Sequence, residues 1–399
     1  MLSRLLSSKV VALIALLSVL AAGIWLGGHP RYLPGPVADV LVGDQSRRVV
    51  LEGLDTIHDR YYRAIGRREL SDAALKGAVK DLDDRFSAYF SPKEYAQFNT
   101  SINNQFSGVG MAVRGVKAGL RIETVYPGSP ARQAGIRVGD VITHADGHRL
   151  AGIPEASATA IIKGPEGTKV TLRLRRGAST LVKRVTRATI SIPVVGSRLA
   201  NAGGKRVAYV ALSTFGPRTA HEEVAAAIRK QKARGAKGIV FDLRGNGGGL
   251  VSEAQLIASM FLRSGPIVTT RGRAVEAHTL NATGHPIAGS MPTVVLVDGG
   301  TASAAEIVAG ALQDRKRATI VGVKTFGKGV FQEIMPLTNG GALDITVGQY
   351  FLPSGRNLGG GGVKQGSGIK PDVRAADDPA TRHRDEALER ALAVLARKL

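Results

Sequence analysis

Three polar side chains in the C-terminal half of the chain have types and spacing suited to acyl transfer: Ser303, Lys328 and Gln332. Ser303 follows an apolar run, residues 294–297, and a pair of glycines, and it precedes a segment of helical composition, residues 304–312. We therefore expect Ser303 where a strand turns into a helix. Unpaired N–H groups and the dipole at a helix start stabilise negative charge beside such a hydroxyl. This position favours a nucleophilic serine.

A structural role competes with the catalytic one at this position. Ser303 and Glu306 also match the capping box S-x-x-E, in which the serine only satisfies the first helical N–H groups. Lys328 shifts the balance, because it stands between two glycines, and burial there would lower its pKa and leave a neutral amine that can accept the serine proton. On a strand, Gln332 would emerge on the same face as Lys328 and could orient that amine.

A glycine-rich segment, DLRGNGGGL at residues 242–250, lies between a buried-strand pattern and a helical pattern. Gly245 and Gly247 match the first two glycines of a dinucleotide loop, but Leu250 occupies the third position, and no G-K-[ST] follows. The N–H groups of this loop could instead face a substrate carbonyl. A tight turn that needs glycine for steric reasons is the alternative.

Other common chemistries lack their residues. The eight histidines include no H-x-x-x-H pair, His221-Glu222-Glu223 lacks the second histidine of a zinc protease, and no G-x-S-x-G surrounds Ser303. Cysteine is absent, which excludes a disulfide or a thiolate metal site. We expect neither a metal nor a cofactor.

Charge and the N-terminus indicate where the protein works. The net charge is +22, but the basic residues are scattered and no aromatic platform accompanies them, so we expect no nucleic acid partner. Arg4 and Lys9 precede an uncharged, apolar run at residues 10–26, which resembles a signal sequence or a short membrane anchor. We expect an exported protein, either periplasmic or membrane-anchored and facing outside the cytoplasm. A buried N-terminal helix of a cytosolic protein is the alternative.

The middle of the chain has the texture of a small β-rich domain, with short strands and glycine turns. It resembles a PDZ domain in the loop Gly108-Val109-Gly110-Met111 and in the run PGSPARQAGIRVGDVI at residues 127–142. In PDZ domains such a loop presents N–H groups to the carboxylate at a peptide's end. The resemblance implies partners that are proteins or peptides bound through their C-termini. A domain that serves only as a spacer is the alternative.

Beyond residue 190, apolar strands alternate with helical patterns, which indicates an α/β architecture. In order along the chain, DLDDRFSAYFSPKEY, the PDZ-like part, DLRGNGGGL, GGTASAAEIVAGALQDRKRATIVGVKTFGKGVFQ and GGALDITVGQYFLPSGRNL resemble the C-terminal processing peptidases, or tail-specific proteases. The resemblance implies a Ser303 nucleophile, a Lys328 base 25 residues later, since 328 − 303 = 25, and Gln332 beside that base. It implies an oxyanion hole made by the amides of Ala304 and Gly249.

The resemblance also implies the fold and the reaction. We expect a multidomain α/β protein with a crotonase- or ClpP-like protease core, acting as a serine endopeptidase on exported proteins, and a homo-oligomer is possible. A catalytically silent tail-binding module and a crotonase-like acyl-thioester enzyme remain alternatives. Thr301 and Ala305 stand where many family members have serine. The expected parts are a signal sequence or membrane anchor at 1–30, a helical region at 31–98, the PDZ domain at 99–189, the protease core at 190–375 and a C-terminal helix at 376–399.

Overall fold

The structure is a computed structural model that describes residues 2–28, 45–284, 286–361, 366, 368–378, 380–381 and 383–399. The chain divides into two compact units, Met1–Asp83 and Asp84–Leu399. This boundary falls within the helical region expected at 31–98, whose first part, up to residue 44, lies outside the described residues. The last residues of that expected region belong to the larger unit because they pair with its strands.

The smaller unit is helical: α1 (Leu2–Gly28), α3 (Gln45–Arg60) and α4 (Arg67–Lys80). The apolar run at 10–26 lies in α1. Over the parts of the chain that the structure describes, no helix combines the length and the apolar character needed to cross a membrane.

The larger unit begins with β1 (Ala88–Phe90) and α5 (Pro92–Ile102). The sequence predicted only helices in this region, so β1 is a correction. Its three residues pair antiparallel with the start of β18 (Ala342–Phe351), and Ala88 lies opposite Asp344. A strand that short has no periodic signal of its own and exists only because β18 provides a partner.

The PDZ-like domain follows, and its outline agrees with the sequence. Gly110, whose φ is 82°, interrupts the strand-like run at residues 106–113. Residues 140–150 form a hairpin that turns at Asp146 and Gly147, both with positive φ. The elements are β2 (Gln105–Gly108), β3 (Met111–Val116), β4 (Gly119–Val125), α6 (Pro130–Gln133), β5 (Val141–Ala145), β6 (His148–Arg149), α7 (Glu155–Ile162), β7 (Lys169–Arg176), β8 (Ser179–Thr186) and β9 (Ala188–Ser191).

The core contains a six-stranded sheet in the order β10-β11-β12-β15-β16-β19. The first pair is antiparallel and the remaining pairs are parallel. The expected alternation of strands and helices is therefore confirmed. The elements are β10 (Val195–Ala202), β11 (Lys205–Leu212), α8 (Ala220–Ala233), β12 (Ile239–Asp242), α9 (Val251–Ser259), β15 (Thr293–Val297), α10 (Ala304–Asp314), β16 (Thr319–Gly322), β19 (Val373–Arg374) and α11 (Glu386–Ala396).

Helices cover both faces of this sheet. Phe241 and Val295 point into the hydrophobic core shared with α8, α9 and α10, whereas their neighbours Val240 and Val294 point into a second core built with α11. Because successive strand residues face opposite sides, a strand covered on both faces is apolar throughout. This explains the apolar runs from which the sequence predicted buried strands.

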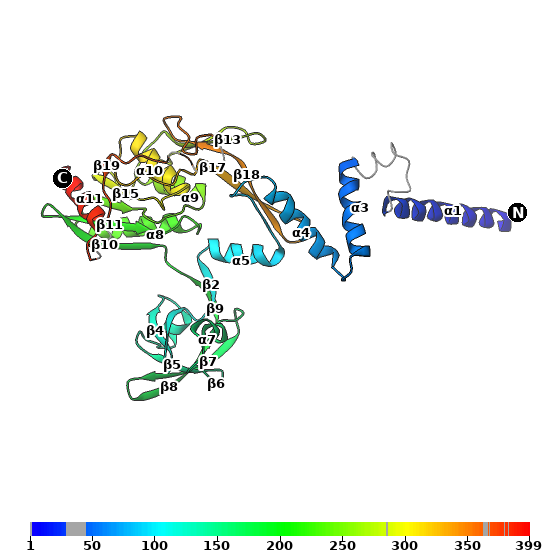
Figure 1. Ribbon diagram of the computed structural model, residues 1–399, viewed down its shortest axis with the longest axis horizontal. Helices are drawn as coiled ribbons and strands as arrows, with labels where there is room; N and C mark the ends of the chain where they lie inside the picture. The colour runs from blue at the N-terminus through cyan, green and yellow to red at the C-terminus, as the bar shows by residue number, and fades with distance from the viewer. Residues whose placement is uncertain are drawn as a thin grey trace. The chain divides into compact units, whose positions relative to one another are not determined.

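A second sheet has the order β1-β18-β13-β14, with β17 paired to β18 on its other edge. It adds β13 (Pro266–Gly272), β14 (His278–Asn281) and β17 (Val330–Pro336). Figure 1 shows β17 and β18 as a long antiparallel ribbon. The multidomain α/β class with a small β-rich domain is thus confirmed, and the specific likeness to a crotonase or ClpP core stays a prediction.

Candidate active site

Ser303 lies where β15 has turned toward α10, as the sequence predicted. Its backbone has φ 55° and ψ −119°, a conformation that costs a non-glycine residue on the order of 1–3 kcal/mol and persists only where surrounding structure enforces it. Gly248 is part of that structure, because a Cβ atom added to it would lie 2.8 Å from the Ser303 Cβ. The glycine-rich loop therefore packs directly against the candidate nucleophile.

The competing role of Ser303 as a helix cap is only partly realised. Ser303 and Glu306 occupy the two positions of a capping box, and the Ser303 amide donates to Glu306 Oε2 at 2.9 Å. The Ser303 hydroxyl faces the Glu306 amide in the capping-box arrangement but accepts no cap hydrogen bond of normal geometry. The glutamate thus fixes the backbone at this position, while the hydroxyl is left for other partners.

Glu306 connects the serine to the lysine segment. Its carboxylate is fully buried and accepts four hydrogen bonds: from the amides of Ser303 (2.9 Å), Gly327 (2.8 Å) and Lys328 (3.0 Å), and from Thr325 Oγ1 (2.5 Å). Burial raises the pKa of Glu306, and these hydrogen bonds act against that rise. One buried side chain therefore positions the backbone of both candidate catalytic residues.

Lys328 has the environment expected of a base. Its Nζ donates to Gln332 Oε1 at 2.7 Å and lies 4.6 Å from the centre of the Phe86 ring. Burial lowers the pKa of Lys328, although the charges of Asp344 and Asp84 act in the opposite direction. Among the described residues, no hydrogen bond joins Lys328 Nζ to Ser303 Oγ. In a ligand-free site such a contact is often long and forms only with substrate.

Gln332 contacts Lys328 as predicted, but not through strand alternation. Lys328 precedes β17, which starts at Val330, and the pairing of β17 with β18 shifts its register between Phe331 and Gln332. The prediction that both residues share one regular strand was therefore wrong. Gln332 Nε2 donates to Thr346 Oγ1 at 2.8 Å, which fixes the amide so that its oxygen faces the lysine.

Sequence reasoning missed a group of residues from the start of the larger unit. Ser87 Oγ donates to Asp84 Oδ2 at 2.6 Å and accepts from the Thr346 amide at 2.9 Å. Burial acts to raise the pKa of Asp84, but hydrogen bonds led by Ser87 outweigh it and leave that pKa below its usual value. In the same group, the Phe86 ring lies against Lys328 Nζ, and the charge of Asp84 acts on that amine. In the sequence these residues lie in the segment DLDDRFSAYF. Its helical spacing predicted only a role in packing.

The two amides expected to bind an oxyanion face no acceptor within the described chain. Ala304 begins α10, and its N–H donates no hydrogen bond there. Gly249 pairs with Phe215 through its neighbours, since Phe215 N donates to Gly248 O and Leu250 N donates to Phe215 O. The Gly249 N–H therefore points away from that pairing. The assignment of the oxyanion hole to these two residues stays a prediction.

An ion-pair network holds the glycine-rich loop against the sheet. Arg244 donates to Asp242 Oδ2 at 2.7 Å and to Asp385 Oδ1 at 2.8 Å, so the loop is tied to the start of α11. Tyr209 donates to the same Asp242, and burial, supported by that carboxylate, raises the pKa of Tyr209 to about 12. This network gives the C-terminal helix a positioning role.

The predicted peptide loop of the PDZ-like domain also forms a groove. Gly108, Val109, Gly110 and Met111 line it, and Thr159 and Ile162 of α7 are among the residues on its other side. An added Cβ atom on Gly110 would lie 2.2 Å from the Ser129 Cβ, so only glycine fits. A groove between a strand and a helix, closed by a glycine loop, is the shape that accepts a peptide end as an added strand.

Comparison with known proteins agrees with this arrangement. The model of peptidase family S41 matches residues 206–375, and a PDZ domain model matches residues 121–176. These stretches fall inside the ranges expected for the core and the PDZ domain. Ser303, Lys328 and Gln332 all lie within the first match.

Curated relatives match over most of the chain. A carboxyl-terminal-processing protease of Synechocystis sp. is 33% identical over 355 residues, which cover 85% of this chain and 83% of that protein. A CtpA-like serine protease of Staphylococcus haemolyticus is 31% identical over 323 residues, 80% of this chain, but the chain spans only 63% of that relative's length. Among solved structures, a photosystem II D1 C-terminal processing protease has a TM-score of 0.50 and 27% identity, covering 88% of this chain and 97% of that one.

Proposed function

Because the chain belongs to peptidase family S41, we propose that it is a serine endopeptidase of the C-terminal processing type with a Ser303–Lys328 dyad. The observation on which this rests is the shared carboxylate of Glu306, which receives the backbone amides of both residues. A half-buried lysine with a lowered pKa, beside the fixed oxygen of Gln332, is the second support.

In this mechanism, neutral Lys328 accepts the Ser303 proton as Oγ attacks the carbonyl carbon of a peptide bond. The resulting oxyanion is bound by the amides of Ala304 and Gly249. The lysine ammonium then gives its proton to the leaving amine, and an acyl-enzyme forms. A water molecule, deprotonated by the same lysine, attacks the ester and releases the new C-terminus and the free serine.

We further propose that the PDZ domain selects substrates by their C-terminal carboxylate, which the loop at Gly108–Met111 would bind. The support is the groove that this loop forms with α7. The substrates would then be proteins with accessible ends, and cleavage would occur after such an end has bound.

We also propose that the protein is exported, from the basic residues and apolar run at its N-terminus. Fractionation of cells that express the full chain would test this: the protein is expected outside the cytoplasm, and removal of residues 2–28 is expected to retain it inside. Equal location of the two forms would contradict export.

The central experiment measures cleavage of an unfolded protein that ends in a free apolar C-terminus, comparing wild type with Ser303→Ala and Lys328→Ala. We expect both variants to lose cleavage. Lys324→Ala is the matched control, because Lys324 is an exposed lysine four residues earlier, and it should retain the wild-type rate. Cleavage by Ser303→Ala at the wild-type rate would refute the dyad.

Two other outcomes would support the alternatives. Tail-peptide binding without cleavage by any version would indicate a silent binding module. Turnover of an acyl-thioester that depends on Ser303 would indicate the crotonase-like chemistry instead.

A further inference from the structure

The PDZ domain has a basic surface on the side of its sheet that faces away from the domain core. In β7 the side chains of Val170, Leu172 and Leu174 are buried in that core. Because successive strand residues face opposite sides, Arg173 and Arg175 point outward, and both are exposed. The proposed mechanism gives this outer side of the sheet no role.

Strand pairing places three more arginines on the same side of the sheet. Residues that lie directly opposite each other on paired strands have their side chains on one face. This places Arg121 of β4, Arg149 of β6 and Arg184 of β8 on the face of Arg173 and Arg175, and all five are exposed. We call these five arginines the basic face. The pairs that establish it are Arg121 with Val141, Val141 with Arg175, Arg149 with His144, His144 with Arg173, and Thr171 with Arg184.

Few carboxylates are near enough to balance this charge. Glu123 is the only acidic residue in the six strands of the sheet, and it lies 4.0 Å from Arg114. Asp146, in the turn between β5 and β6, lies 3.8 Å from the buried Arg187. Among the ion pairs of the described residues, none includes an arginine of the basic face.

A face that merely contacts solvent is the alternative explanation. Such faces usually mix both signs of charge, and like charges on neighbouring strands destabilise a sheet. Arg173 and Arg175 lie two residues apart on β7, and Arg184 lies diagonal to Arg173 on the next strand. The sheet therefore contains a repulsion that no ion pair of the described residues offsets. This favours a partner outside the domain, and the partner must be anionic.

A lipid bilayer fits this face better than a folded acidic protein. The arginines are spread over four strands, with neighbouring strands about 4.8 Å apart. Lipids diffuse laterally, so anionic headgroups can gather under arginines at any spacing, whereas a folded protein would need carboxylates at matching positions. Val182, which lies opposite Arg173, is 62% exposed. An apolar side chain among basic ones suits the boundary between headgroups and acyl chains.

The basic face does not overlap the peptide groove of the same domain. Helix α7 forms one wall of that groove, and its Ala158 and Ile162 pack in the core that also contains Leu172 and Leu174. The helix therefore covers the inner side of the sheet, whereas the arginines lie on the outer side. A bilayer bound to the basic face would leave the groove accessible.

We propose that the basic face, together with Val182, docks the PDZ domain on the surface of an anionic lipid bilayer. Each arginine near such a surface is attracted to it, and salt screens the attraction. We expect one arginine to contribute roughly threefold to fivefold to the affinity. The proposal goes beyond the peptidase function and is independent of it, because docking involves no cleavage.

The test uses the absence of cysteine from the chain, since one introduced cysteine can then bind an environment-sensitive fluorophore. Thr180 is exposed and lies opposite Arg175, so Thr180→Cys puts the label on the basic face of the full chain. Ser157→Cys puts it on an exposed position of α7, on the other side of the sheet. The label reports local contact, so any binding of the apolar run at residues 10–26 to the same vesicles does not hide the result.

The labelled chains are mixed with phosphatidylcholine vesicles that contain an increasing share of phosphatidylglycerol. We expect the label at position 180 to respond as the anionic share rises, and the response to weaken as salt is added. At the share that docks half of the chains, Arg173→Gln should lower the ratio of docked to undocked label roughly threefold to fivefold, and Arg173→Lys should retain most of it. Arg132→Gln is the matched control, because Arg132 is an exposed arginine of α6 outside the basic face, and it should leave the ratio unchanged.

Several outcomes would overturn the proposal. These are an equal response to neutral and anionic vesicles, an equal response of the labels at positions 157 and 180, and equal losses in Arg173→Gln and Arg132→Gln. A response to soluble polyglutamate without one to anionic vesicles would identify an acidic polypeptide as the partner and would also overturn it. Failure of the chain to cleave proteins would refute the peptidase function and leave this result standing.

Discussion

The segment around Ser303 in the core and the loop Gly108–Met111 in the PDZ domain are held in place differently. In the core, a buried carboxylate fixes the backbone, since Glu306 accepts from Ser303, Gly327 and Lys328. In the PDZ domain, steric exclusion does so, because Gly110 fits only without a side chain. A site in which negative charge forms during a reaction needs hydrogen-bond donors held in fixed positions. A site that only binds a carboxylate already present needs a fixed shape.

The largest effect is expected from a change of shape at the core site. Gly248→Ala would place a Cβ atom 2.8 Å from both Ala302 O and Ser303 Cβ and displace the serine from the loop amides. We expect cleavage to fall by roughly 100- to 1000-fold, as for loss of an oxyanion donor. Gly247→Ala, which meets nothing within 4 Å, should have a much smaller effect. Similar rates for the two variants would mean that shape does not matter in the core.

Removal of the shared carboxylate should act on stability. Glu306→Ala leaves three amides and the Thr325 hydroxyl without their acceptor, so we expect the free energy of unfolding to fall by about 3 kcal/mol or more. Thermal and denaturant unfolding would measure it. Glu333→Ala, at an exposed glutamate, is the matched control. If Glu306→Ala lost no more stability than Glu333→Ala, the buried carboxylate would not be what holds the core segment in place.

In the PDZ domain, the corresponding prediction concerns Gly110, the glycine that fits only without a side chain. Gly110→Ala is expected to weaken binding of a peptide with a free C-terminus by roughly tenfold or more, since strain and the clash with Ser129 each cost on the order of 1 kcal/mol or more. Gly128→Ala is matched in its positive φ but meets nothing within 4 Å, and it should bind better than Gly110→Ala. Titration of a labelled peptide into the Ser303→Ala chain would measure both.

The smallest effect concerns pH. In the proposed mechanism Lys328 acts when neutral, so cleavage should rise with pH through the pKa of Lys328, which burial lowers from its usual value. The charge of Asp344 favours the ammonium form and raises that pKa. Asp344→Asn should therefore move the acid limb of the pH–rate profile to lower pH. A shift to higher pH would show that Asp344 influences the rate by another route.

Sequence predicted well the features that depend on neighbouring residues. The strand before Ser303 and the helix after it have clear apolar patterns, so the position of the serine followed from local structure. The PDZ loop was equally visible, because its two glycines, Gly108 and Gly110, are separated by a single residue. The contact between Lys328 and Gln332 was predicted too, although through a regular strand that the structure does not contain.

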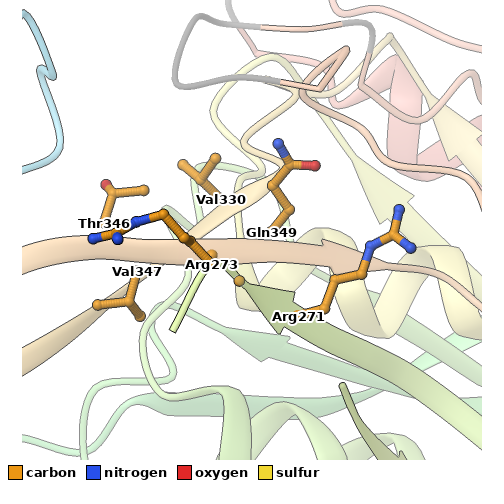
Figure 2. Close-up of a pocket in the computed structure, with 8 residues that line it drawn as sticks. Arg271, Arg273, Val330, Thr346, Val347 and Gln349 are labelled. Carbon is orange, nitrogen blue, oxygen red and sulfur yellow. The ribbon is translucent and has the colours of Figure 1, made fainter. Parts of the chain in front are cut away.

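What sequence could not predict depends on pairing between distant segments. Phe86 and Ser87 lie beside Lys328 and Thr346 only because β1 pairs with β18, and no periodicity records that pairing. The packing of Gly248 against Ser303 needs the loop and the helix start to be placed together. The pocket drawn in Figure 2 likewise lies where β1 and β13 share one edge of β18.

The pairing of β1 with β18 has a consequence for synthesis of the chain. Residues 88–90 leave the ribosome early, and their partner at 342–344 follows about 250 residues later, so this contact is among the last that a growing chain can make. The PDZ strands lie between the two and can close on themselves meanwhile. The surroundings of Lys328 are therefore completed only near the end of translation. Until then, the nascent protease lacks part of its candidate active site.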